Sequence, residues 1–250
     1  MADRRAYKTD ASFLEKLVIG ATGTKGVFAD LQKQGHRPIE LERGSMSYKI
    51  WKKIKIKRLR VPDLLCLACA TRTEARAKTD LEISMSHSLA DEERSWDKGL
   101  GDNDMVGLAL CTRTGMGATD WEASDLIQYI PAKALRRAFQ EKQTIVSEAK
   151  GSQEGFEVRV LWPSAVASAD GSVKAVSGDR VQIQRSADNL TLSYSLKRRD
   201  IGLKILVAVG DPVRAGQIIA SVVPVTRTFK CRGGASANTY MQLLTSLAVP

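Results

Sequence analysis

Two acidic and two basic residues between positions 63 and 78 have the types and spacing of a metal-dependent hydrolytic site. Asp63 lies in a nearly continuous apolar run, and Glu74 follows eleven positions later. In a β-strand, alternation places Glu74, Arg76 and Lys78 on one face. Two carboxylates from adjacent strands can hold Mg²⁺ or Mn²⁺ and position a water for attack on a phosphodiester. The pattern therefore indicates Asp63 and Glu74 as metal ligands, with Arg76 and Lys78 beside the water.

The same stretch resembles the PD-(D/E)XK nuclease superfamily. Positions 62 and 63 match the PD element, and positions 74–76 match the (D/E)XK element, with arginine in place of lysine. The resemblance covers roughly residues 11–140 and implies a restriction-endonuclease-like α/β domain that cleaves DNA with Mg²⁺. In these nucleases the two acids bind the metal, and the lysine orients the attacking water.

The arginine at position 76 leaves the catalytic assignment open. A guanidinium keeps its proton at any usable pH, so Arg76 cannot simply replace an amine beside a water, whereas Lys78 on the same face can take that role. An alternative register uses Glu82 with Ser84 in the following strand. The competing interpretation is a surface ion pair between Glu74 and Arg76, which would make the protein a non-catalytic DNA-binding module on a degenerate nuclease fold.

The cysteines suggest a second metal site. The chain has four of them: Cys66, Cys69, Cys111 and Cys231. The first two form a CxxC pair, which lies between the PD and (D/E)XK elements as in restriction enzymes of the DpnI type. A structural Zn²⁺ needs four ligands, and the other two thiols complete such a set, with His36 and His87 as alternatives. The competing interpretation is that two of the cysteines are buried as core residues. If zinc is bound, a zinc-stabilised interaction scaffold without a nucleic-acid role is a further alternative for the function.

A basic segment precedes the acidic site. Between Glu42 and Asp63 the sequence contains lysines and arginines but no acid. The residues expected to contact phosphates are Lys52, Lys53, Lys55, Lys57, Arg58 and Arg60. Together with a net charge of +10, this segment predicts a DNA partner. A charged edge strand that prevents aggregation is the alternative.

The sequence predicts a helix, then several strands, then a second helix, and these elements must position the residues above. A helical pattern over residues 11–34 contains three glycines, which indicate a break or a close backbone approach near Gly23, and Gly35 ends it. Strand patterns follow around residues 39–41, 54–56, 61–67, 81–85, 104–111 and 127–130. Pro131 fits the first turn of a further helix.

Short alternating runs separated by Asp-Gly and Gly-Asp turns continue from residue 156 to residue 223, which predicts a small all-β barrel or sandwich. The run over 206–222 contains Val209-Gly210-Asp211, Val213, Gly216 and Gln217, and with these residues it resembles sandwich-barrel hybrid and biotinyl/lipoyl modules. It lacks the displayed lysine of a prosthetic-group carrier, so we expect a structural barrel. The predicted domains are 1–145 (nuclease-like), 152–228 (β-barrel) and 229–250 (C-terminal segment).

The composition limits where in the cell we expect the protein and which partners we expect it to have. No apolar run approaches the ~20 residues of a membrane span, and the first residues lack a signal peptide's apolar stretch. We therefore expect a cytoplasmic protein with no membrane partner, reduced cysteines and possible homodimerisation. The resulting hypothesis is a DNA-binding, Mg²⁺- or Mn²⁺-dependent endonuclease with a possible Zn²⁺ site.

Overall fold

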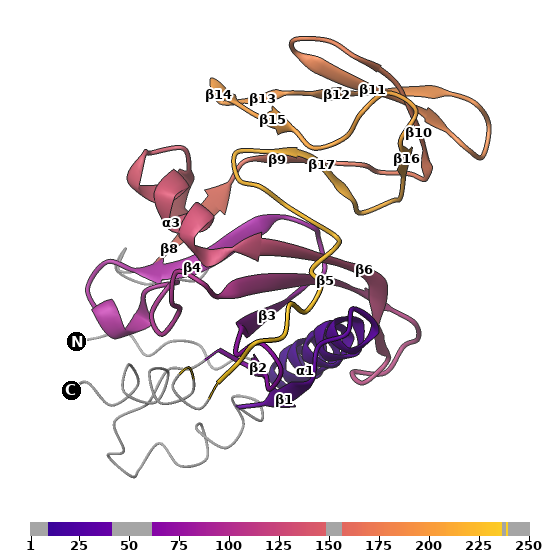
Figure 1. The fold of residues 1–250 in the computed structure, drawn as a ribbon. Helices are drawn as coiled ribbons and strands as arrows, with labels where there is room; N and C mark the ends of the chain where they lie inside the picture. The colour runs from indigo at the N-terminus through magenta and orange to yellow at the C-terminus, as the bar shows by residue number, and fades with distance from the viewer. Residues whose placement is uncertain (1–9, 42–61, 149–156, 237–238, 240–250) are drawn as a thin grey trace. The chain divides into compact units, whose positions relative to one another are not determined.

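The computed structural model describes residues 10–41, 62–148, 157–236 and 239 (Figure 1). This part of the chain is mostly β-sheet, with two α-helices and one short 3₁₀-helix. None of its helices combines the length and apolarity needed to cross a membrane. The chain forms two compact units: Met1–Thr79 with Asp97–Ala132 and Thr228–Pro250, and Asp80–Trp96 with Lys133–Arg227.

The first unit is a helix against a five-stranded mixed sheet. Its elements are α1 (Asp10–Lys33), β1 (Pro38–Glu40), β2 (Leu64–Cys66), β3 (Arg72–Lys78), β5 (Met105–Arg113) and β6 (Trp121–Pro131). The strand order is β1-β2-β3-β5-β6, and every neighbouring pair is antiparallel except β3 and β5, which run parallel. Val27 and Leu31 of α1 pack with Leu64 and Ile127 in one buried cluster.

The glycines of α1 let the helix approach the sheet closely. A Cβ atom at Gly23 would lie 2.5 Å from the Cβ of Ala77 in β3, and one at Gly26 would lie 2.7 Å from the Cβ of Ala123 in β6. Such distances are too short for carbon atoms, so only glycine fits. The predicted helix is confirmed, and of the two alternatives at Gly23 the structure has the close approach, since α1 is continuous.

The substitution Gly23→Ala is expected to destabilise the protein by about 1–3 kcal/mol, because overpacking outweighs the gain in helix propensity. Gly20→Ala is the matched control: nothing lies within 4 Å of a Cβ there, so it should stabilise the helix by up to about 1 kcal/mol. Urea midpoints at unchanged m-value measure both effects. Equal stabilisation by the two substitutions would contradict the close helix–sheet contact.

The second unit begins with a three-stranded sheet of order β4-β8-β7, beside η1 and α3. Their bounds are β4 (Ile83–Ser88), η1 (Glu92–Arg94), α3 (Ala132–Gln140), β7 (Ile145–Glu148) and β8 (Glu157–Trp162). Trp162 is fully buried, and its Nε1 donates to the carbonyl of Leu135 in α3 at 3.0 Å. Trp96 packs edge-on against Trp162, with ring centroids 4.9 Å apart. These aromatic contacts join the strands to α3.

The remaining strands of the second unit form small sheets around one core. They are β9 (Ser164–Val166), β10 (Gly171–Val176), β11 (Arg180–Arg185), β12 (Thr191–Ser195), β13 (Lys197–Arg198), β14 (Ile201–Gly202), β15 (Lys204–Ile205), β16 (Pro212–Val213) and β17 (Ile218–Ser221). Val173 and Ile183 of the β12-β11-β10-β16 sheet share a buried cluster with Ile219 of the β15-β17-β9 sheet. The predicted turn at Gly210 has φ of +90°, and Asp211 closes it by accepting the N–H of Ala208 at 2.8 Å.

The division into units differs from the boundaries of 1–145, 152–228 and 229–250 expected from the sequence. The strand β4 pairs along its whole length with β8 rather than with the sheet of the first unit. Ile83 is thereby paired with Trp162, and Met85 with Val160. The apolar residues that alternate along β4 thus lie opposite the apolar residues that alternate along β8. The last segment, from Thr228, returns to the first unit.

Candidate metal centre

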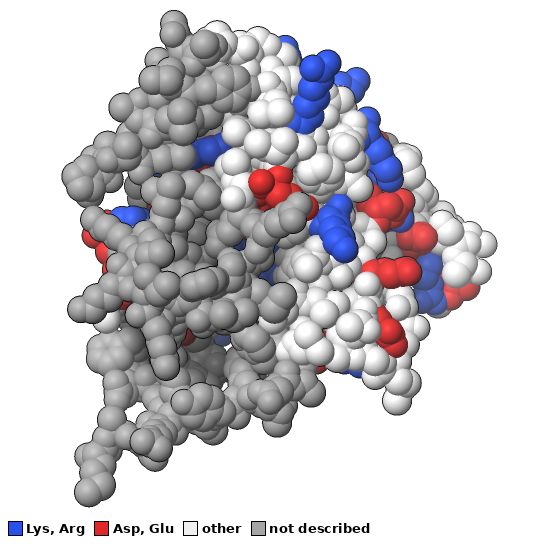
Figure 2. All heavy atoms as spheres, turned by 90° about the horizontal axis from the view of Figure 1, so that it is seen from below, with Lys and Arg blue, Asp and Glu red and all other residues white. Residues whose placement is uncertain are grey.

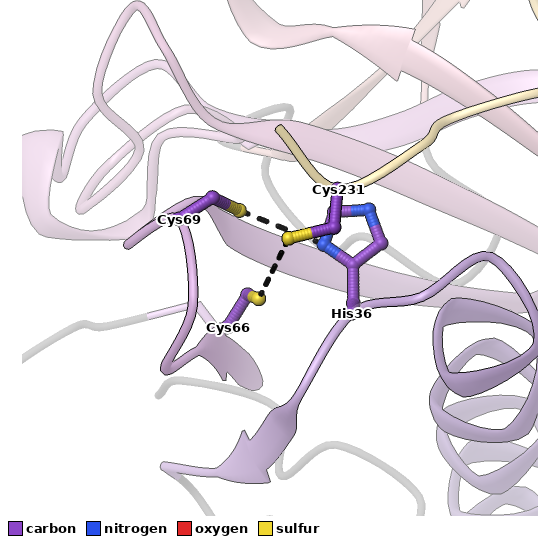
Figure 3. Close-up of side chains that lie close together, drawn as sticks. All are labelled: His36, Cys66, Cys69 and Cys231. Carbon is purple, nitrogen blue, oxygen red and sulfur yellow. Dashed lines mark hydrogen bonds between the residues drawn. The ribbon is translucent and has the colours of Figure 1, made fainter. Parts of the chain in front are cut away.

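Four side chains in the first unit converge on one point. The ligand atoms of His36, Cys66, Cys69 and Cys231 all lie within 4.8 Å of one another. Figure 3 shows the three thiols and the imidazole pointing toward each other from three separate parts of the chain. No disulfide links these cysteines.

The end of α1 positions His36. Gly35 adopts φ of +85°, its N–H donates to the carbonyl of Gln32, and the N–H of His36 donates to the carbonyl of Leu31, both at 3.0 Å. This pair of hydrogen bonds is the Schellman motif, which ends a helix at glycine. The ring of His36 is therefore held just beyond the last helical turn, where it is 5% exposed.

The turn after β2 positions the CxxC pair. Cys66 is the last residue of β2, and its carbonyl accepts the N–H of Ala70 at 2.8 Å. Its N–H donates to the carbonyl of Thr71 at 2.9 Å, which starts the antiparallel pairing with β3. The hydroxyl of Thr71 lies 3.3 Å from the sulfur of Cys69. A tight turn between two paired strands thus brings both thiols to the same side.

Cys231 enters from the C-terminal segment. Its N–H donates to the carbonyl of Gln34 at 3.4 Å, and the N–H of Phe229 donates to the Oε1 of Gln34. The ring of Phe229 packs against Tyr129 and His36, with centroids 5.3 and 4.7 Å away. The sulfurs of Cys231 and Cys66 are 3.9 Å apart. The Cys₃His cluster therefore lies where the described residues from 228 onward rejoin the first unit.

Hydrogen bonding fixes the tautomer of His36. Its Nε2 lies 2.6 Å from the carbonyl oxygen of Phe229, an acceptor, so Nε2 carries the proton. In the neutral ring Nδ1 then has the free lone pair, and Nδ1 lies 3.6 Å from the sulfur of Cys69. A histidine that donates its other N–H to a backbone carbonyl is the usual arrangement at a metal.

The environment of the thiols favours one thiolate. Burial by itself raises the pKa of Cys66, but the backbone N–H groups of Arg37, Ala68 and Cys69 donate toward its sulfur and lower the pKa to about 6. The N–H of Arg37 is 3.3 Å from that sulfur. Burial raises the pKa of Cys69. A thiolate is the form that binds metal, so Cys66 is prepared for coordination.

Cys111 does not belong to this cluster, so the predicted four-thiol set is wrong at that position. It lies in β5 on the face covered by α1, is 1% exposed, and its Sγ points to the carbonyl of Ile19. Burial raises its pKa, as for an ordinary core thiol. His36 takes the fourth place, while the other alternative, His87, lies in β4 against Phe139. The helix end at Gly35 is the one local feature of the sequence that marks the position of His36, and it does not by itself separate His36 from Cys111 as a ligand.

The donor set fits zinc. Three sulfurs and one imidazole nitrogen are the ligands of structural Zn²⁺ sites, whereas Mg²⁺ requires oxygen. Tetrahedral bonds of about 2.1–2.3 Å place ligand atoms slightly less than 4 Å apart. The observed spread, up to 4.8 Å, therefore requires only a small contraction. With four protein ligands the coordination is closed, as in structural rather than catalytic sites.

The acidic pair lies along the β2–β3 hairpin. Asp63 directly precedes β2, and its Oδ2 accepts the backbone N–H of Ala75 at 2.8 Å, one residue from Glu74. Because Ala77 meets α1, alternation puts Glu74 and Arg76 on the other face of β3. The carboxylate of Glu74 is 3.0 Å from the guanidinium of Arg76. Lys78 ends the strand on the same side.

The alternative register with Glu82 and Ser84 does not join Asp63. Ser84 lies in β4, whose sheet contains neither β2 nor β3. Glu82 forms ion pairs with Arg159 and Arg198, and the hydroxyl of Ser84 is 3.1 Å from Arg159. The register is therefore incorrect, because long-range pairing with β8 removes this strand from the hairpin's sheet.

The basic residues from Lys52 to Arg60 lie outside the described part of the chain. On the face drawn in Figure 2, blue and red side chains are interspersed over the described surface. That view therefore contains no large described area of one charge.

No protein-family model, curated protein or solved structure matches this chain. The first unit is therefore described by its geometry alone. It combines a Cys₃His cluster that could hold a metal ion with a mixed sheet in which Asp63 and Glu74 lie along the β2–β3 hairpin.

Proposed function

We propose that this protein is a DNA-binding, Mg²⁺- or Mn²⁺-dependent endonuclease whose restriction-endonuclease-like core is stabilised by zinc. The observation that carries the proposal is the hydrogen bond from the N–H of Ala75 to the carboxylate of Asp63, at 2.8 Å. It holds Asp63, the residue directly before β2, one residue from Glu74 in the adjacent antiparallel strand β3. Two acids on neighbouring strands are what a divalent cation at a phosphodiester requires.

The order of elements supports the same proposal. Among the described elements of the first unit, α1 comes first, then β1, β2 and β3, which pair antiparallel in turn, and then β5, with the PD element before β2 and the (D/E)XK element in β3. A bound Mg²⁺ would lower the pKa of a water and neutralise charge on the phosphate. The chain's own part is to hold the acids and to place a cation, Lys78 or Arg76, on the same face of β3.

The zinc cluster has a structural part in this proposal. It joins the end of α1, the turn that connects the two strands bearing the acids, and the C-terminal segment. A closed tetrahedral site contributes folding free energy without taking part in the chemistry. The hairpin would therefore keep its geometry only while the metal is bound.

A non-catalytic DNA-binding protein is the second candidate, and one observation favours it. Arg76 takes the place of the usual lysine and is 3.0 Å from the carboxylate of Glu74. An arginine paired with a metal-binding acid competes with the cation for that acid. Such a protein would bind DNA and leave it intact.

The test is incubation of the zinc-loaded chain with supercoiled plasmid, with and without Mg²⁺ or Mn²⁺. Cleavage is expected only with the divalent ion, and Asp63→Asn should lower its rate by at least about 10³-fold, because a metal ligand is lost. Glu82→Gln, an acid of the second unit, should leave the rate unchanged. Cleavage that survives Asp63→Asn in pure protein would overturn the assignment.

A further inference from the structure

A cavity of about 580 Å³ opens beside the metal cluster, within the first unit. Cys69 and His36 form its metal side. Lys230 and Arg232 flank Cys231 on the C-terminal segment and also line the cavity, and its other lining residues are Thr71, Asn103, Thr228, Phe229 and Gly233. Its size lies within the usual range of about 300–1,000 Å³ for small-ligand pockets.

The lining suits an anion. It contains two permanent cations, hydroxyl groups and a carboxamide, and no lining side chain described is a carboxylate. Three thiolates and one Zn²⁺ together carry a formal charge of −1. Lys230 and Arg232 carry +2, so the net formal charge around the cavity is +1. The balance of charge in the cavity therefore favours a ligand with one or two negative charges, such as a phosphate group.

The C-terminal segment presents its cations because its other residues are anchored. Phe229 packs on Tyr129, Cys231 joins the cluster, and both are partly buried, whereas the alternate residues Lys230 and Arg232 are exposed. Beyond them Gly233 has φ of +63° and Gly234 has φ of +85°, which turns the chain back toward the CxxC turn. The backbone that carries the two cations is thus anchored on both sides of them.

The segment that carries Asn103 is also anchored. Asn103 precedes Asp104, which is 4% exposed and receives two hydrogen bonds from the guanidinium of Arg72, at 2.9 and 2.7 Å. A Cβ at Gly101 would lie 2.8 Å from Arg72, so this turn fits closely over the ion pair. A buried, bidentate pair makes a rigid support for the exposed amide of Asn103.

We propose that this cavity binds one nucleotide of a DNA strand, with Lys230 and Arg232 on its phosphate and Asn103 hydrogen-bonded to the rest of the nucleotide. The choice of a DNA nucleotide as ligand rests on the proposed function. The cavity is larger than a lone phosphate needs, and its lining combines the two cations with the neutral hydrogen-bonding side chains of Asn103 and Thr71. The metal cluster, by fixing Cys231, fixes the phosphate-binding pair.

Calorimetric titration of the zinc-loaded full chain with deoxyadenosine 5′-monophosphate, without Mg²⁺, tests the inference. The unphosphorylated nucleoside should bind at least about tenfold more weakly, and so should the nucleotide to the double variant K230Q/R232Q, because charge-assisted hydrogen bonds are lost. The control K25Q/K33Q removes the same charge from exposed positions of α1, outside the cavity, and should bind the nucleotide like the wild type.

Two results would overturn the inference. The first is equal nucleotide binding by K230Q/R232Q and the wild type. The second is a K230Q/R232Q variant that loses zinc but binds the nucleotide normally once zinc is added back. The second would mean that the cations only neutralise the thiolates. Failure of the proposed function looks different. A chain that binds the nucleotide through this pair but never cleaves DNA refutes the endonuclease alone, and a chain that cleaves DNA while K230Q/R232Q binds normally refutes this inference alone.

Discussion

Replacing Cys66 with alanine is expected to abolish zinc binding and to remove most of the stability of the first unit. Structural Zn²⁺ in a four-ligand site binds with an apparent free energy of about 10–16 kcal/mol. Because the site does not exist in the unfolded chain, this binding free energy stabilises the folded state. The cluster joins three distant segments, so its loss should release the C-terminal segment together with the CxxC turn.

Elemental analysis should find about one equivalent of zinc per wild-type chain and none in Cys66→Ala. Cys111→Ala is the matched control, because Cys66 and Cys111 are both buried strand residues, 3% and 1% exposed. It should keep the zinc and lose only the ~1–2 kcal/mol of a small core truncation. Zinc lost from Cys111→Ala but kept in Cys66→Ala would contradict the Cys₃His cluster.

The second large effect is expected at Lys78. If Lys78 performs the task of the family's lysine, Lys78→Ala should lower the rate of DNA cleavage by about 10²–10⁴-fold, the usual contribution of a positioned proton-transfer or orienting group. DNA affinity should change little, because one charge is lost from a chain of net charge +10. Arg76→Lys should be tolerated or should raise the rate, since it restores the amine of the family pattern in place of the guanidinium that pairs with Glu74.

Plasmid cleavage and salt-dependent DNA binding, measured on the same preparations, separate the alternatives. Lys25→Ala, on the exposed side of α1, is the control for charge loss. In the degenerate-site alternative the wild type binds DNA but does not cut it, and Asp63→Ala alters neither property. Full cleavage activity in Lys78→Ala would exclude Lys78 and return the task to Arg76.

Local features of the site followed from the sequence because short-range contacts set them. Gly35 predicted the end of α1, and the same glycine fixes His36 through two hydrogen bonds within six residues. The CxxC pair predicted half of a metal site, since a tight turn between paired strands must bring its thiols together. Period-two alternation likewise put Glu74 and Arg76 on one face of β3, independent of what packs there.

The tertiary structure alone decided which distant residues meet. The sequence led us to expect Cys111 as the fourth ligand, with His36 as an alternative, and the structure reverses this order because Cys111 lies beneath α1 in the sheet interior. The strand β4 had no sequence mark that assigned it to β8, because apolar alternation fits any sheet with a free edge. The sequence left open whether the glycines of α1 mark a helix break or a close approach. The structure decides for the close approach, because Ala77 lies where a Cβ at Gly23 would be. Each of these outcomes depends on long-range packing, in which residues compete for the same partners across the whole chain.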